Sequence, residues 1–254
     1  MTDPALFQAA SFFAQTGYVR CPAEVPQTLL QELTRVTGLL FERPTPPYRS
    51  SDVTGGVCRV DGLLARHDVY MRTLQSEPVR PLLEALLGPN IEVARFRHNH
   101  ATLNRAGEVP LRLHRDVQQW TRPVVNVFIY LEPSEQANGA TVLVPTSQTI
   151  PYCGPQAGGG GGNWADAHEA SNALTDQAVT VSMPAGGVLF MNGLTFHSVG
   201  VNSTSRTRRS LVFACRSSDD LQHPELVSVE QVAGRARFKG HEGQPISGSL
   251  RLGG

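Results

Sequence analysis

The sequence predicts a mainly β domain with flanking helices, and three observations support this fold class. Apolar residues at helical spacing dominate the first part of the chain, and short apolar, β-branched segments between turn residues follow from position 91. A chain of 254 residues is long enough for a single β-barrel domain of the larger sort. We expect one domain over 1–254, with a helical buttress at about 1–90, a barrel core at about 91–216 and an irregular tail at 217–254.

The sequence predicts several helices in the first part of the chain, before the barrel. Asp3 followed by Pro4 is typical of a helix start, because Asp caps the first turn and Pro fits within it. A second helix should begin near Pro26. Its apolar stripe consists of Leu29, Leu33, Val36 and Leu40. Gly88, which follows a leucine-rich segment, should end a further buried helix.

Several other segments are assigned by composition. Residues 43–58 are rich in Pro and Gly, so we expect an irregular loop near the site entrance. Residues 91–105 can form one long strand, and 124–131 should be a central strand. The glycine run at 158–162 lacks the Gly-Lys-Ser/Thr end of a phosphate loop, which favours a mobile lid or crossover over nucleotide binding.

Charge and hydropathy argue against several functions. The formal net charge is zero at pH 7, so no electrostatic field favours nucleic acid or an anionic membrane. No basic N-terminal region precedes a long apolar run, and no apolar segment reaches the length of a membrane span. We expect a soluble, cytoplasmic protein, monomeric or homodimeric, that acts on a small molecule.

Cysteine and lysine usage carry two further expectations. Cys21, Cys58, Cys153 and Cys215 are widely spaced and form no Cys-x-x-Cys pair, so we expect reduced thiols. Lys239 is the one lysine among 22 basic residues. Anions should therefore be bound by arginine, whose planar fork suits two-point carboxylate contacts.

His114-x-Asp116 is the first candidate for chemistry. Residues two apart in a strand point to the same side, so His114 and Asp116 could reach one ion while Arg115 points away. Eight histidines and nine aspartates give about 0.3 such steps by chance in this chain, so the pair is weak evidence by itself. A half-buried His beside an exposed, salt-bridged Asp would explain it as well.

A second group of candidates lies near His197. An apolar segment at 188–191 lies between two turns and leads to His197, a context that presents a side chain at a strand start. A polar turn follows, and the next strand begins with Arg208, which can return beside His197. Alone, Arg208 would be interpreted as a solvated strand end. Two imidazoles and a carboxylate on one side of a metal suit non-haem Fe(II) and oxygen chemistry.

His98-x-His100 is a rival metal pair, because cupin-type sites also use His-x-His on a strand. Such a site needs a carboxylate a few residues later, and none occurs before Glu108. We therefore prefer the metal ligands His114, Asp116 and His197.

The ordered set of motifs resembles the phytanoyl-CoA dioxygenase-like family of Fe(II)/2-oxoglutarate oxygenases over roughly residues 8–216. The motifs are Gly17-Tyr18-Val19, His114-x-Asp116, Asn138-Gly139-Ala140, Val144-Pro145-Thr146-Ser147, the apolar strand ending at Phe190, His197, Gly200-x-Asn202-Ser203 and Arg208. The resemblance implies a double-stranded β-helix, a jelly-roll or cupin-like barrel with the metal at its mouth.

The resemblance also implies a reaction. Fe(II) would be held by His114, Asp116 and His197, and 2-oxoglutarate and O2 would take the remaining positions. Arg208 would pair with the distal carboxylate of 2-oxoglutarate. Succinate and carbon dioxide are released while a C–H bond is oxidised, by default to the alcohol, with epimerisation, desaturation and ring closure as alternatives. Asp116 argues against halogenation, which needs chloride in place of that carboxylate.

Further residues are assigned to the pocket. Thr102, His100 and Asn104 share one face of the expected strand and should surround cosubstrate and substrate. The amide of Asn126 lies in an apolar strand, so it either bonds to neighbouring backbone or contacts the 2-oxoglutarate carboxylate. Two tryptophans, Trp120 and Trp164, could border the substrate, although packing or an ordinary surface loop explains them as well.

The chain departs from the family pattern in two places. Thr146-Ser147-Gln148 stands where the family usually has Gly-Ser-His, so we expect a different turn geometry there. Val199 occupies the place of a hydroxyl residue that often binds 2-oxoglutarate, so that hydrogen bond must come from elsewhere or be absent.

Two other classes of function remain open. A zinc hydrolase could use the same ligands but has no need of Arg208. A non-catalytic, cupin-like small-molecule binder is the third. Nothing in the sequence resembles a CoA-binding surface, and we expect a modest polar metabolite as substrate, such as an amino-acid-like compound or an intermediate of secondary metabolism.

Overall fold

The computed structural model describes residues 3–95, 98–108, 113–116, 124–150, 163–164, 171–218 and 229–234. The helices are α1 (Pro4–Thr16), α2 (Gln27–Glu42), α3 (Val69–Leu74), α4 (Val79–Leu87) and α5 (Ser171–Asp176), with 3-10 turns at Leu63–Ala65 and Ser147–Thr149. The strands are β1 (Tyr18–Arg20), β2 (Tyr48–Ser50), β3 (Val57–Asp61), β4 (Ile91–Ala94), β5 (Asn99–Asn104), β6 (His114–Arg115), β7 (Val125–Tyr130), β8 (Thr141–Leu143), β9 (Asn163–Trp164), β10 (Val179–Val181), β11 (Val188–Asn192), β12 (His197–Val199), β13 (Arg208–Ser217) and β14 (Val229–Ala233).

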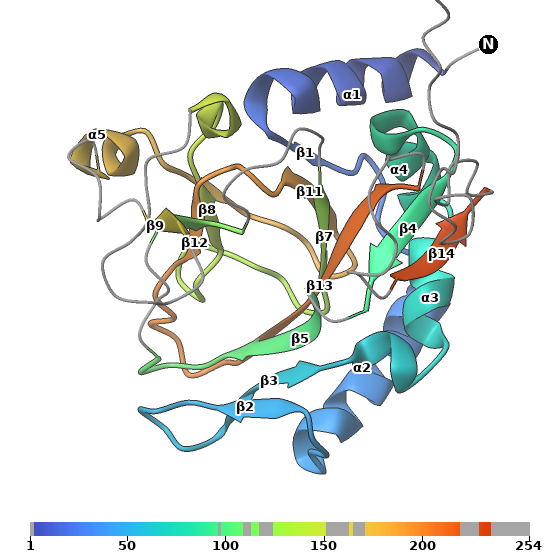
Figure 1. The fold of residues 1–254 in the computed structure, drawn as a ribbon. Helices are drawn as coiled ribbons and strands as arrows, with labels where there is room; N and C mark the ends of the chain where they lie inside the picture. The colour runs from blue at the N-terminus through green and yellow to red at the C-terminus, as the bar shows by residue number, and fades with distance from the viewer. Residues whose placement is uncertain are drawn as a thin grey trace, which may run out of the picture.

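The strands form two antiparallel sheets. The larger has the order β1-β11-β7-β13-β5-β3-β2, with β4 pairing to both β13 and β14. The smaller has the order β10-β8-β12-β6-β9. Figure 1 shows α2, α3 and α4 along one side of the larger sheet, with the smaller sheet at the opposite side. The prediction of a mainly β fold with flanking helices is confirmed.

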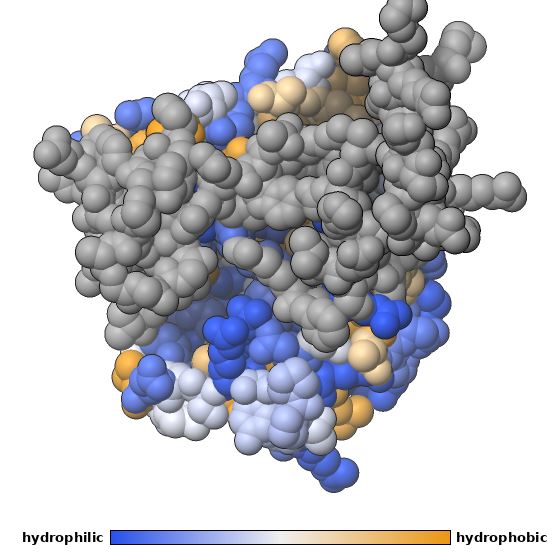
Figure 2. All heavy atoms as spheres, viewed as in Figure 1, coloured by the Kyte–Doolittle hydropathy of each residue, from blue (hydrophilic) through white to orange (hydrophobic). Residues whose placement is uncertain are grey.

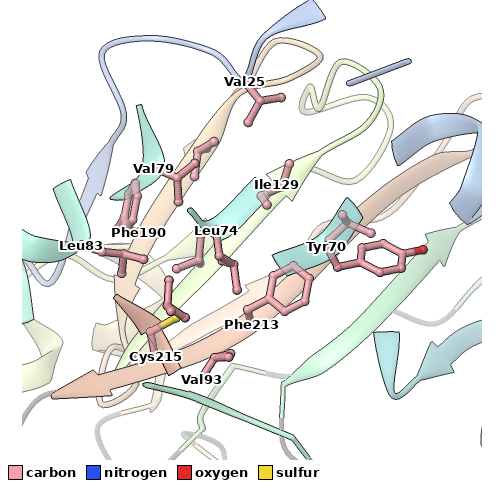
Figure 3. Close-up of a cluster of buried hydrophobic side chains, with 14 of the residues drawn as sticks. Val25, Tyr70, Leu74, Val79, Leu83, Val93, Ile129, Phe190, Phe213 and Cys215 are labelled. Atoms are coloured by element: carbon pink, nitrogen blue, oxygen red, sulfur yellow. The ribbon is translucent and has the colours of Figure 1, made fainter. Parts of the chain in front are cut away.

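The main hydrophobic core lies between the helices and the larger sheet. Phe213 and Cys215 of β13, Ile129 of β7 and Phe190 of β11 point toward Leu83 and its neighbours on the helices (Figure 3). All these side chains are buried, because alternate residues of a strand share one face and that face is apolar here. The core therefore covers one face of the larger sheet and leaves the other face toward the barrel interior.

The expected helix signals are present. Asp3 caps α1 by accepting a hydrogen bond from the Ala5 amide, and Gly17 ends the helix in the left-handed conformation. Pro26 precedes α2, whose residues Leu33 and Val36 are buried as predicted. The apolar stripe of α2 therefore packs into the main hydrophobic core, as predicted.

Two expectations are wrong. Residues 91–105 do not form one strand: β4 ends at Ala94, β5 begins at Asn99, and His98 between them has a φ of 47°, which no strand residue adopts. Residues 43–58 contain the strand β2 and the start of β3, which pair as a hairpin instead of forming an irregular loop. The hairpin forms because β3 pairs with β5, a strand distant in the sequence. The Pro and Gly content of residues 43–58 does not reveal that partner.

Several expectations concern residues that the structure describes only in part. The glycine run at 158–162, Trp120 and Cys153 lie outside the described residues. Cys21, Cys58 and Cys215 are free thiols, in accord with the reduced state expected. The tail contributes β14, which pairs with β4. Among the described helices, none has the length and apolar character needed to cross a membrane.

Candidate metal and cosubstrate site

Two neighbouring strands of the smaller sheet bring the metal-binding candidates together. β6 pairs with β12 so that His114 and His197 are register partners, and Asp116 follows β6 directly. Nε2 of His114 lies 3.8 Å from Asp116 Oδ1, and Nε2 of His197 lies 3.4 Å from Asp116 Oδ2. The three ligand atoms all fall within 4.8 Å of one another. One ion can therefore be reached by all three side chains.

The imidazole of His197 is held in a fixed orientation. Its Nδ1 lies 3.0 Å from the Thr195 carbonyl oxygen, to which a protonated Nδ1 donates, so Nε2 keeps its lone pair toward Asp116. The Thr195 hydroxyl in turn donates to the carbonyl of Gly17 at the end of α1. The rings of Phe128 and His197 pack in a T-shaped arrangement, with their centroids 6.3 Å apart. This arrangement selects the tautomer that a metal ligand needs.

Asp116 is buried, and each of its carboxylate oxygens contacts a polar side chain. Asn126 donates its amide to Asp116 Oδ2 at 2.5 Å, and His98 Nε2 lies 3.2 Å from Oδ1. Burial alone would raise the pKa of Asp116, but the imidazoles of His197, His98 and His114 outweigh it and hold that pKa well below the usual range. The carboxylate is therefore ionised, as a metal ligand must be.

Ser147 joins the two strands that carry the metal-binding candidates. The carbonyl of Ser147 accepts a hydrogen bond from the guanidinium of Arg115 at 2.8 Å. Its hydroxyl accepts one from the amide of Phe196 at 2.8 Å. Arg115 follows His114 and Phe196 precedes His197, so one serine fixes the spacing of β6 and β12. The sequence assigned Arg115 only to the side away from the metal, and the structure gives it this buried contact.

The turn before Ser147 retains the conformation that glycine favours. Thr146 has a φ of 67°, which is costly for a β-branched residue. Its amide donates to the Thr16 carbonyl, and the side chain of Gln148 donates to the carbonyls of Ala14 and Gln15. The turn thus docks on the end of α1. In this chain the turn therefore combines a positive φ at Thr146 with side-chain contacts from Gln148 to α1.

Arg208 is buried, with 2 % of its surface exposed, on the inner face of β13. One terminal nitrogen donates to the carbonyl of Gly139 at 2.8 Å and the other to the Ser210 hydroxyl at 3.3 Å. Within the described residues its Nε has no hydrogen-bond partner. Burial lowers the pKa of Arg208, but an arginine stays charged at neutral pH. A buried cation with an unused donor is suited to an anionic ligand.

Hydroxyl groups surround Arg208. The Thr102 hydroxyl lies 2.9 Å from that of Ser210, which is also bonded to Arg208. The Tyr130 hydroxyl lies 2.7 Å from that of Thr141, and the Tyr130 ring faces the Arg208 guanidinium at 5.9 Å. Thr141 is the register partner of Val199 on β8. Hydroxyl groups are therefore present close to the position where Val199 lacks one.

The proposed substrate residues lie at different places, and one of them lies outside the described residues. His100 is buried on the inner face, and burial first, then Arg59 and His98, lowers its pKa well below the usual range. Asn104 of β5 is the register partner of Arg208 of β13, and its side-chain amide donates to the Gly139 carbonyl at 3.4 Å. Trp164 is the register partner of His114 on β9. Trp120, as noted, lies outside the described residues.

Sequence reasoning missed four residues of the site. Tyr130 and Ser210 could have been found from strand alternation, since they share a face with Asn126 and Arg208 respectively. His98 was considered only as a rival ligand, because its turn conformation has no sequence signal. Ser147 was noted as part of a motif without a role.

A second trio, Glu32, His67 and Asp68, also has ligand atoms close together. Arg72 pairs with Glu32 at 2.6 Å and with Asp68 at 3.1 Å, so these carboxylates are already neutralised. The buried trio is the better metal site.

The donor set fits the groups that the resemblance implies. Two imidazole nitrogens and one ionised carboxylate suit Fe(II), and they leave other positions open. The unpartnered Nε of Arg208 and the adjacent hydroxyls suit a carboxylate.

Curated relatives are dioxygenases of low identity. The chain is 23% identical over 252 residues to "Dioxygenase sphC" of Aspergillus fumigatus, a match that covers 91% of this chain and 65% of the relative. It is 26% identical over 163 residues to "Dioxygenase af480" of Aspergillus fumigatus, covering 61% of this chain and 47% of the relative. The chain thus spans less than two thirds of the length of these two relatives.

Solved structures share the fold. The epimerase SnoN, crystallised with Fe3+, alpha ketoglutarate and nogalamycin RO, superposes with a TM-score of 0.72 at 20% identity, covering 97% of this chain and 93% of SnoN. EctD from S. alaskensis with bound Fe gives a TM-score of 0.68 at 13% identity, covering 84% and 76% of the two chains. The expected double-stranded β-helix is confirmed.

The sequence also matches the profile described as Phytanoyl-CoA dioxygenase (PhyH) over residues 13–210. This range contains every metal and cosubstrate candidate named above. The chain belongs to the phytanoyl-CoA dioxygenase family.

Proposed function

We propose that the protein is an Fe(II)- and 2-oxoglutarate-dependent oxygenase that oxidises a C–H bond of a small metabolite. The observation that carries the proposal is the presence, inside one barrel, of a buried His-Asp-His trio and a buried arginine with an unused donor. Family membership and the dioxygenase relatives support it.

His114, Asp116 and His197 would hold the metal, which when bound supplies the redox chemistry between 2-oxoglutarate, dioxygen and the substrate. Asn126 and His98 orient the Asp116 carboxylate through their contacts with its two oxygens. The buried amide of Asn126 thus has a protein partner, and its Oδ1, without a hydrogen-bond partner among the described residues, remains available to a bound ligand.

Arg208 would bind the distal carboxylate of 2-oxoglutarate. Thr102 would act through Ser210, whose hydroxyl bonds to both Thr102 and Arg208. Tyr130 would border the same carboxylate, because its ring faces the guanidinium. Burial strengthens each of these contacts by excluding water.

The substrate is proposed to be a modest polar metabolite of secondary metabolism. SnoN was crystallised with nogalamycin RO, and a second neighbour is the carbocyclase SnoK from nogalamycin biosynthesis. Hydroxylation is the default outcome, and epimerisation or ring closure needs only a differently placed C–H bond. His100, Asn104, Trp120 and Trp164 remain proposed substrate residues.

The test is an anaerobic titration followed by turnover. Metal-free protein should develop a metal-to-ligand absorption band only when both Fe(II) and 2-oxoglutarate are added. Exposure to air should then yield succinate, and Zn(II) in place of Fe(II) should yield none. Absence of both the band and iron-dependent succinate would contradict the proposal, and hydrolysis supported by Zn(II) would identify a zinc hydrolase instead.

A further inference from the structure

A cavity of about 700 Å³ lies beside the β2–β3 hairpin, and the mechanism proposed above makes no use of it. Five of its lining residues provide apolar surface: Pro46, Pro47, Tyr48, Leu64 and Ala65. Its charged residues are Arg49, Arg59, Arg66, Arg95 and Asp61, a formal excess of three positive charges. In Figure 2, the lower part of the surface, where β2 and β3 lie in Figure 1, is mostly hydrophilic.

The cavity borders the same side of the larger sheet as the metal candidates. Asp61 is the register partner of His100, and antiparallel partners share a face. The rings of His100 and His98 lie 5.7 Å apart, and His98 Nε2 lies 3.2 Å from Asp116. Asp61 on the cavity wall is thus separated from the metal candidate Asp116 by two neighbouring side chains, those of His100 and His98.

The cavity arginines differ in how many of their side-chain donors already form hydrogen bonds or ion pairs within the protein. Arg66 is committed to the fold, because it donates to the backbone carbonyls of Asp61, Thr45 and Pro47. Its side chain thus closes one end of the hairpin.

Arg49 and Arg59 share a single carboxylate. Arg59 Nε donates to Asp61 Oδ1 at 2.7 Å, whereas Arg49 reaches Oδ2 only at 4.0 Å and has a side chain 69% exposed. They are register partners, so both guanidiniums project from one face of the hairpin. Two guanidiniums against one carboxylate leave donors for a second anion, and arginine pairs favour two-point carboxylate contacts.

We propose that this cavity binds the substrate, and that the substrate is a small organic acid whose carboxylate is bound by Arg49 and Arg59 and whose apolar body lies against the proline-rich wall. The volume is in the range of about 300–1,000 Å³ usual for small-molecule sites. The assignment of the ligand as substrate rests on the proposed function, whereas the binding chemistry does not.

The test uses the full chain without metal or 2-oxoglutarate. The probes are two matched pairs: 3-phenylpropionate with 3-phenylpropionamide, and cyclohexanecarboxylate with its carboxamide. Dissociation constants are measured by ligand-observed NMR. We expect each acid to bind about tenfold more tightly than its amide, the usual scale of one charge-assisted hydrogen bond.

Variants locate the binding site. The ratio of the amide to the acid dissociation constant should fall by about fivefold or more in Arg49→Gln. It should fall to one in the double variant Arg49→Gln, Arg59→Gln. The preference for the acid should persist in Arg206→Gln, an exposed arginine elsewhere on the surface, and in Arg208→Ala, which removes the rival anion site. Because Arg49 is largely exposed, Arg49→Gln tests the proposal even where Arg59→Gln impairs folding.

Two results would overturn the inference: acids that bind no more tightly than amides, or a preference that is lost in Arg208→Ala and retained in Arg49→Gln. Selective binding of acids by a protein that makes no iron-dependent succinate would refute the proposed oxygenase and leave the binding site intact. The two proposals therefore fail separately.

Discussion

The two faces of the larger sheet are built from the same strands and differ in polarity and in how completely their polar atoms are hydrogen-bonded. On β13, Leu211, Phe213 and Cys215 point to the helices, whereas Arg208 and Ser210 point into the barrel. The first set is apolar and closely packed, and burial strongly raises the pKa of the Cys215 thiol, which stays protonated. Strand alternation thus separates a supporting face from a chemical face.

The chemical face contains buried polar atoms whose hydrogen bonds are incomplete. Among the described residues, His100 Nδ1, Asn126 Oδ1 and Arg208 Nε are buried without a hydrogen-bond partner. Each unsatisfied group of this kind destabilises the folded state by about 1–3 kcal/mol. The apolar face must offset this cost, and a ligand bound as proposed would complete the hydrogen bonds of the polar face. Three substitutions test it, and a fourth tests the strained turn at Thr146.

The largest effect is expected for Asp116→Ala. Loss of the one carboxylate among the proposed metal ligands should weaken Fe(II) binding by more than about 100-fold and reduce turnover below detection. Isothermal titration and a succinate assay measure the two effects. Asp52→Ala, at an exposed aspartate, should change neither. Full iron-dependent turnover of Asp116→Ala would mean that the metal is held elsewhere.

On the supporting face, Phe213→Ala should cost about 3–5 kcal/mol of unfolding free energy, because a large buried ring leaves a cavity. Chemical denaturation measures this loss. Fe(II) and 2-oxoglutarate affinities of the folded fraction should be unchanged. If affinity fell while stability held, the separation of the two faces would be refuted.

Arg208→Ala should weaken 2-oxoglutarate binding by about 1.5–3 kcal/mol, roughly 10- to 150-fold. Arg206→Ala and Arg209→Ala provide controls, since Arg206 is exposed and Arg209 pairs with Glu132. Anaerobic titration of the absorption band distinguishes the three variants. A large loss in either control, with none in Arg208→Ala, would show that the cosubstrate pocket has been placed wrongly.

The smallest effect concerns the strained turn. Thr146→Gly should raise the free energy of unfolding by up to about 1 kcal/mol, because glycine adopts a positive φ without strain. Thr149→Gly in the same turn should lower it, since the Thr149 hydroxyl bonds to the Thr146 carbonyl. Thermal unfolding compares the two. Equal losses in both variants would mean that Thr146 is not strained.

Sequence patterns predicted those features that depend on local chemistry. Asp3 and Gly17 bound α1, the central strand lies at β7, and the proposed ligands His114, Asp116 and His197 do come together. Contacts between segments that are distant in the sequence were not predicted. The β2–β3 hairpin depends on β5 for its partner, and His98 reaches Asp116 because the chain turns between β4 and β5. Neither feature has a periodic signature within its own segment.

Within the described part of the chain, a single residue pair, His114 with His197, defines the register between β6 and β12. An ion bound by both side chains would therefore act as a cross-link at the narrowest seam of the smaller sheet. Binding to the native state alone adds about 2.7 kcal/mol of stability when the free ion exceeds its dissociation constant 100-fold. Loss of the proposed ion would then lower the free energy of unfolding as well as abolish turnover.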